Sequence, residues 1–110
     1  MAVQNVPVTV VRLDGELNSL SGPKLKQHLH ELFTSGTLRV IIDLSNVVFI
    51  DSMGLGALVS GLKNAKQNGG NLVLVGLCEQ ARTIFELTMA FRIFDLFPTM
   101  EEAQAFLEER

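Results

Sequence analysis

Tryptophan and tyrosine are absent from this sequence of 110 residues, and its seven phenylalanines occur singly. The chain therefore lacks an aromatic platform on which nucleic-acid bases could stack. Lysine and arginine form no run, and the formal net charge is -3. A surface that attracts nucleic-acid phosphates or an anionic membrane needs clustered positive charge. Neither nucleic acid nor membrane is therefore expected as a partner.

Long apolar runs and paired cysteines are also missing. Charged residues interrupt every apolar window before the roughly 18 residues that a membrane span requires. The N-terminus has no charged region followed by a long apolar core, so no signal peptide is expected. The single Cys78 has no internal disulfide partner, which fits the reducing cytoplasm, and its apolar neighbours predict a small buried side chain.

The sequence does contain core material, in two alternating patterns. Hydrophobic residues make up 47% and charged residues 19%, which suits one globular domain over residues 1–110. β-branched and apolar runs predict strands at residues 6–13, 38–44 with an extension at 47–50, 71–77 and near 94–97. Apolar residues at helical spacing predict helices from Gly22 to Gly36, from residue 52 to Gly69, over residues 79–88, and after a capping box of Thr99 and Glu102.

Strands that alternate with helices predict an α/β fold. Right-handed crossovers then give a mostly parallel sheet of about four to five strands, flanked by about four helices. We expect strands 6–13 and 94–97 at the edges of this sheet. Asp14 and Gly15 predict a turn or a bulge after the first strand.

Catalytic constellations are incomplete in this chain. His28 and His30 lie two apart on one predicted helix, so they point to different faces and form no joint metal or acid-base site. Ser52 has Gly54 two residues after it but Ile50 two residues before it, which leaves a nucleophile elbow half formed. The glycine motifs that hold dinucleotides or phosphates are also broken. We therefore expect no enzyme and no cofactor.

The stretch FIDSMGLGALVSGL, residues 49–62, begins a helix with an aspartate and a serine. Asp51 or Ser52 can accept a hydrogen bond from the first free amides, which is worth about 1 kcal/mol. Ser52 also lies at an accessible strand-to-helix junction, where a phosphate would add up to about two negative charges beside Asp51. Gly54 and Gly56 each cost about 1 kcal/mol in a helix, for which close approach of a partner and packing against the sheet are equally good reasons.

The longer stretch VIIDLSNVVFIDSMGLGAL resembles the signature of STAS domains, specifically those of the bacterial anti-sigma factor antagonists. VVRLDGELN, GGNLVLVG and IFELTMAFRIFDLFPTMEEA support the resemblance, which extends over residues 10–103. It implies a small mixed sheet flanked by helices, and regulation by partner switching. In that mechanism the antagonist binds an anti-sigma factor that is also a serine kinase, and the sigma factor is displaced. Phosphorylation then dissolves the complex, and a PP2C-type serine phosphatase resets the antagonist.

The resemblance assigns roles to individual residues. Ser52 matches the phosphorylated serine and Asp51 the acidic residue before it. Met53 stands where a small residue is common, and Asn18 where an aspartate is typical, which alters how a kinase is recognised. The helix start that faces the partner corresponds to Gly54, Leu55 and Gly56, and the neighbouring loop to Gly15, Glu16, Asn18 and Ser19.

The N-terminus of this chain departs from the family pattern. Members of the family often have a further strand before residue 6, where this chain has only residues 1–5. The sheet edge is then shorter or is borrowed from another chain, and a homodimer through strand 6–13 becomes an option.

One alternative function is a STAS interaction module without switching, in a signalling scaffold or a transporter, with Ser52 only as a cap. A small hydrolase or nucleotide-binding enzyme is the other.

Overall fold

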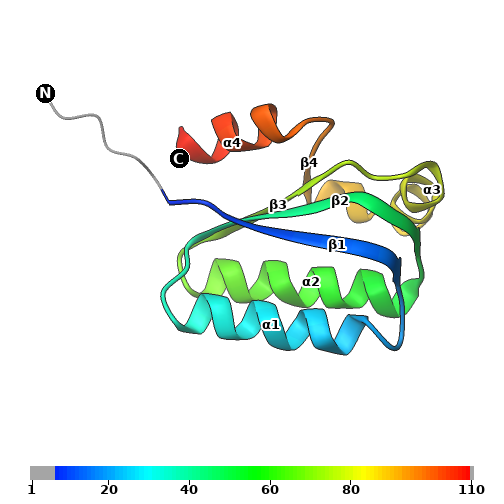
Figure 1. The fold of residues 1–110 in the computed structure, drawn as a ribbon, viewed down its shortest axis with the longest axis horizontal. Coiled ribbons are helices and arrows are strands. Elements are labelled where there is room, and N and C mark those ends of the chain that lie inside the picture. The colour runs from blue at the N-terminus through cyan, green and yellow to red at the C-terminus, as the bar shows by residue number, and fades with distance from the viewer. Residues whose placement is uncertain (1–6, 110) are drawn as a thin grey trace, which may run out of the picture.

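The computed structural model describes residues 7–109, in which strands and helices alternate along the chain (Figure 1). The strands are β1 (Thr9–Leu17), β2 (Arg39–Ile50), β3 (Asn71–Val75) and β4 (Asp95–Phe97). The helices are α1 (Gly22–Thr34), α2 (Ser52–Gln67), α3 (Glu79–Leu87) and α4 (Met100–Glu108), with a 3-10 turn η1 (Ala90–Arg92). The predicted α/β fold is confirmed.

The four described strands form one sheet in the order β1-β2-β3-β4, and each neighbouring pair is parallel. The prediction that the first and last strands lie at the edges is confirmed. Among residues 7–109 no antiparallel strand occurs, so the described sheet is parallel rather than mixed. The further N-terminal strand considered for residues 1–5 lies outside the described residues.

Both faces of the central strands are covered. In Figure 1, α1 and α2 lie along one face of the sheet and α4 lies on the other. Ile42 belongs to the core shared with α1 and α2, whereas its neighbour Ile41 packs in the cluster that contains Leu107 of α4. Both isoleucines are fully buried. The prediction of strands buried on both faces is therefore confirmed for β2 and β3.

The first strand continues beyond its predicted end. Gly15 adopts a left-handed conformation with φ of +75°, and the pairing of β1 with β2 shifts register on either side of Asp14 and Gly15. The bulge alternative is therefore the correct one, and β1 runs on to Leu17, opposite Ile50 of β2. This extension matters for function, because it carries the loop after β1 to the start of α2.

Two local predictions at helix starts have different outcomes. The capping box before α4 is confirmed, since the Thr99 hydroxyl oxygen accepts a hydrogen bond from the Glu102 N–H at 3.2 Å. Cys78 is only half-buried, because it occupies the position before the first turn of α3 instead of the interior of a strand. Its predicted burial is thus partial, although it packs against the main core.

Candidate phosphoacceptor site and partner surface

Asp51 caps helix α2. Its backbone is extended, with φ of -102° and ψ of -176°, and its Oδ1 accepts a hydrogen bond from the Gly54 N–H at 2.8 Å. Its own N–H donates to the Leu17 carbonyl at 3.2 Å. Of the two residues that could have served as the cap, the aspartate therefore does so, and it also joins the helix start to the end of β1.

Ser52 is the first helical residue of α2 and its side chain is exposed. Within residues 7–109, its hydroxyl has no hydrogen-bond partner. Because Asp51 performs the capping, nothing in the helix start depends on the serine oxygen. The hydroxyl is therefore exposed to solvent in the first turn of α2.

The two glycines of this turn face in opposite directions. A Cβ added to Gly54 would collide with the Leu17 carbonyl oxygen and lie 2.7 Å from the carbonyl carbon. A Cβ added to Gly56 would meet no atom within 4 Å. Packing therefore explains Gly54, whereas Gly56 is an exposed helix glycine without a packing reason. Leu55 is also turned inward, with 7% of its surface exposed.

The exposed side of the turn forms one wall of a groove between α1 and α2. The groove has a volume of about 360 Å³. Met53 is 57% exposed beside it, and Lys26 is the charged side chain among the lining residues. The lining residues are Gly22, Pro23 and Lys26 from α1, and Ser52, Met53, Gly56 and Ala57 from α2.

The loop after β1 is held by its own polar groups. The Asn18 Oδ1 accepts hydrogen bonds from the N–H groups of Leu20 at 3.0 Å and Ser21 at 3.3 Å. The Asn18 Nδ2 donates to the Glu16 carboxylate at 3.4 Å. An aspartate at this position would keep the acceptor but place a second negative charge beside Glu16. Asn18 therefore shapes the loop, and Gly15, Glu16 and Ser19 are exposed around it.

The structure brings the sequence-predicted site residues together at the carboxyl ends of β1 and β2, where α1 and α2 begin (Figure 1). Sequence reasoning missed Pro23 and Lys26, although their spacing of three on a helix places them on one face. It also missed Gln80 of α3, whose side-chain amide bonds both the N–H and the carbonyl of Ile50 at 2.8 Å. No local pattern marks that long-range contact.

Asp43 of β2 forms a local cluster with Ser45 and Arg12. Hydrogen bonds from the hydroxyl and backbone N–H of Ser45 hold the pKa of the Asp43 carboxyl below its ordinary value, with a smaller contribution from Arg12, and they outweigh the effect of burial. A lowered pKa makes a carboxylate a weaker general base at neutral pH.

Within residues 7–109 no group of His, Cys, Asp and Glu is placed to hold a metal ion. No helix of this described part has the length and apolar content that crossing a bilayer requires.

The chain is similar to known proteins in both sequence and structure. The model of the STAS domain matches residues 1–103, and the chain belongs to the STAS domain family. An anti-sigma-B factor antagonist from Staphylococcus epidermidis is 37% identical over 78 residues, which are 71% of this chain and 72% of the relative. A candidate anti-sigma factor antagonist from Thermotoga maritima has a similar structure, with a TM-score of 0.87 and 29% identity over 94% of this chain and 88% of the other.

A third similarity concerns the fold alone. The Bacillus cell fate determinant SpoIIAA in its phosphorylated form gives a TM-score of 0.68 at 22% identity, covering 87% of this chain and 86% of that protein. The chain thus shares its fold with a protein whose phosphorylated state has been solved.

Proposed function

We propose that this chain is an anti-sigma factor antagonist that works by partner switching, with Ser52 as the phosphoacceptor. The unphosphorylated chain binds an anti-sigma factor that is also a serine kinase, so that the sigma factor is released. Phosphorylation of Ser52 abolishes this binding, and a PP2C-type serine phosphatase restores it. Such partners place the chain in the cytoplasm.

The observation that carries the proposal is that Asp51, and not Ser52, caps helix α2. Asp51 holds the helix start, and the Ser52 hydroxyl is exposed and unused within the described residues. A kinase can therefore modify Ser52 without removing a capping hydrogen bond. The names of the Staphylococcus relatives support an anti-sigma factor antagonist function, and SpoIIAA is a protein of the same fold that exists in a phosphorylated form.

The partner surface that we propose is the exposed part of the predicted set. Ser52, Met53 and Gly56 line the groove between α1 and α2, and the loop residues Gly15, Glu16, Asn18 and Ser19 lie at the same sheet edge. Gly54 and Leu55 are buried, so they fix the backbone behind this surface. The open face at Gly56 allows another protein to approach the helix closely.

A phosphate on Ser52 would change this surface more than the fold. Lys26 across the groove and the free amides of the first turn favour the added charge, whereas Asp51 repels it. Because these effects oppose each other, we expect phosphorylation to change the folding stability of α2 only slightly. A partner surface that fits the unmodified groove would bury one or two unpaired charges, which costs a few kcal/mol.

The test is to incubate the pure chain with ATP and the serine kinases encoded near its gene, and to locate the phosphate by mass spectrometry. Calorimetry with a kinase that binds should then show Ser52→Asp weakened by roughly 100-fold and Ser52→Ala unchanged. Ser35→Asp places the same charge directly after α1, at the end of that helix opposite to the groove. This variant should bind as the parent chain does.

Two results would contradict the proposal. The first is the absence of phosphate at Ser52 with every kinase that binds the chain. The second is equal affinity of Ser52→Asp and Ser52→Ala for such a kinase. A homodimer through β1 stays a separate prediction: β1 is an edge strand among residues 7–109, and sedimentation of the full chain would test it.

A further inference from the structure

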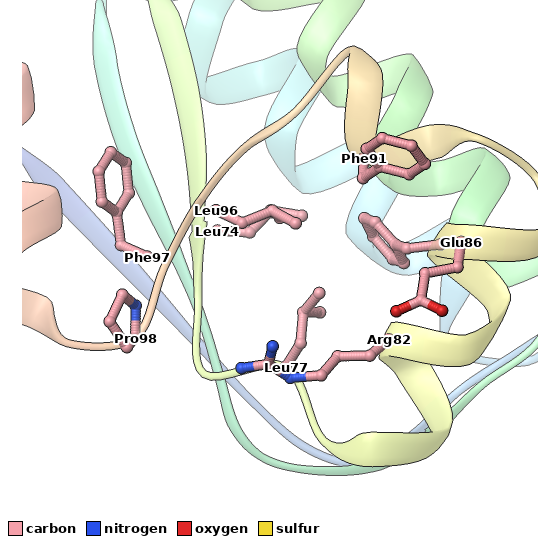
Figure 2. Close-up of a pocket in the computed structure, with 9 residues that line it drawn as sticks. Leu74, Leu77, Arg82, Glu86, Phe91, Leu96, Phe97 and Pro98 are labelled. Carbon is pink, nitrogen blue, oxygen red and sulfur yellow. The ribbon is translucent and has the colours of Figure 1, made fainter.

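A cavity away from Ser52 lies between α3, η1 and β4 (Figure 2). Its volume is about 480 Å³, which falls within the range of about 300–1,000 Å³ typical of small-molecule sites. None of its lining residues belongs to the groove beside Ser52. The lining residues are Leu74, Leu77, Arg82, Phe85, Glu86, Phe91, Leu96, Phe97 and Pro98.

The inner part of this pocket is apolar and preformed. Leu74 and Phe85 are buried, and Leu96 is half-buried beside them. The Phe85 ring lies 5.6 Å from the Phe94 ring, centroid to centroid, which fixes its orientation from behind. Phe91 is 46% exposed at the rim. An apolar ligand side chain would therefore lose part of its water shell against the accessible Leu77, Phe91 and Leu96, while Leu74 and Phe85 form the buried floor beneath them.

Two opposite charges accompany this apolar interior. Arg82 and Glu86 lie four residues apart on α3, and both line the pocket. Residues at this spacing lie on one face of a helix and commonly pair. Here, within residues 7–109, neither side chain makes an ion pair or a hydrogen bond. Figure 2 shows both side chains extending from α3 on the side of the pocket.

We propose that this pocket binds a free α-amino acid with a large apolar side chain, such as leucine or phenylalanine. The ligand carboxylate pairs with the Arg82 guanidinium, and the ligand ammonium with the Glu86 carboxylate. The ligand side chain lies in the hollow between Leu77, Phe91 and Leu96, over the buried Leu74 and Phe85. A fatty carboxylate would bring its negative charge close to Glu86, and an amine would bring its positive charge close to Arg82. Only a zwitterion complements both charges at once.

The pocket can be tested on the full chain by nitrogen-proton correlation NMR with L-leucine and L-phenylalanine. Saturable shifts are expected at the amides of Arg82, Phe91 and Leu96, with a dissociation constant below about 1 mM. Arg82→Gln and Glu86→Gln should each weaken binding by at least about tenfold, because each leaves one ligand charge unpaired. Arg92→Gln and Glu79→Gln change charges that do not line the pocket, and they should bind as the parent chain does.

Analogues separate the zwitterion from other ligands. Leucinamide lacks the carboxylate and N-acetyl-leucine lacks the ammonium, so each should bind at least about tenfold more weakly than leucine. Equal binding of N-acetyl-leucine, or of decanoate, would overturn the proposal, as would the absence of saturation up to about 10 mM amino acid. The experiment involves neither kinase nor Ser52, so its outcome is independent of the proposed switch.

Discussion

The inward and outward sides of the first turn of α2 differ in almost every respect, although their residues alternate along one short stretch. Gly54 is buried against the end of β1, and Leu55 is buried in the main core. Ser52 and Gly56 are exposed on the groove. The inward side thus fixes the position of the turn, and the outward side presents a hydroxyl and an open backbone.

This comparison shows that residues of the same type can be present for opposite reasons. Gly54 leaves no room for a Cβ, whereas Gly56 leaves open space. A substitution on the inward side should therefore change stability, and one on the outward side should change binding. The predictions below test that separation, from the largest expected effect to the smallest.

Gly54→Ala should produce the largest effect. The added Cβ would collide with backbone atoms of Leu17, so the helix start must move away from β1. Overpacking of this kind costs about 3 kcal/mol, a large part of the 5–15 kcal/mol that stabilises a typical domain, roughly speaking. Urea unfolding measures the loss. A change below about 1 kcal/mol would mean that the turn adapts easily and that the inward side is not rigid.

Gln80→Ala should have the next largest effect. The Gln80 amide bonds both backbone groups of Ile50, immediately before the Asp51 cap. Removing it leaves a donor and an acceptor without their partner, at a cost of about 2 kcal/mol. Gln104→Ala is the control, because Gln104 bonds only the exposed Glu108. Thermal unfolding should distinguish the two variants, and equal midpoints would contradict the structural role of Gln80.

Gln80 also illustrates what the sequence could not predict. Helices and strands follow from local apolar spacing, and their observed bounds lie within a few residues of the predictions. The extension of β1 to Leu17 depended on Gly15 forming a bulge instead of a turn, and the local sequence allowed both. The bonds between Gln80 and Ile50 join segments 30 residues apart, and no periodic pattern records them.

In the candidate site, too, the sequence predicted the local elements but not the contacts between distant segments. The carboxyl ends of parallel strands meet at one edge of a sheet, so the loop after β1 and the start of α2 could be expected to lie together. Which glycine faces inward could not be predicted, because it depends on the backbone of Leu17 from a distant strand. The resemblance indicated Ser52 as the predicted phosphoacceptor, whereas the structure identified Asp51 as the residue that caps α2.

Asp51→Ala should cost about 1 kcal/mol, because the Gly54 N–H loses its acceptor. Asp51→Asn keeps an acceptor oxygen and should fold within a few tenths of a kcal/mol of the parent chain. Chemical denaturation of the two variants separates the capping role of Asp51 from its charge. If the two variants lost equal stability, the charge and not the hydrogen bond would hold the helix start.

Gly56→Ala should have the smallest effect on folding and the opposite sign. An exposed helix glycine without neighbours becomes more stable by up to about 1 kcal/mol when it is replaced by alanine. The same methyl group projects into the proposed partner surface, so kinase binding should weaken by about tenfold. Denaturation and calorimetry on one sample measure both quantities. A variant that is more stable and binds unchanged would show that the partner never approaches this backbone, and would move the proposed contact toward Met53 and the loop after β1.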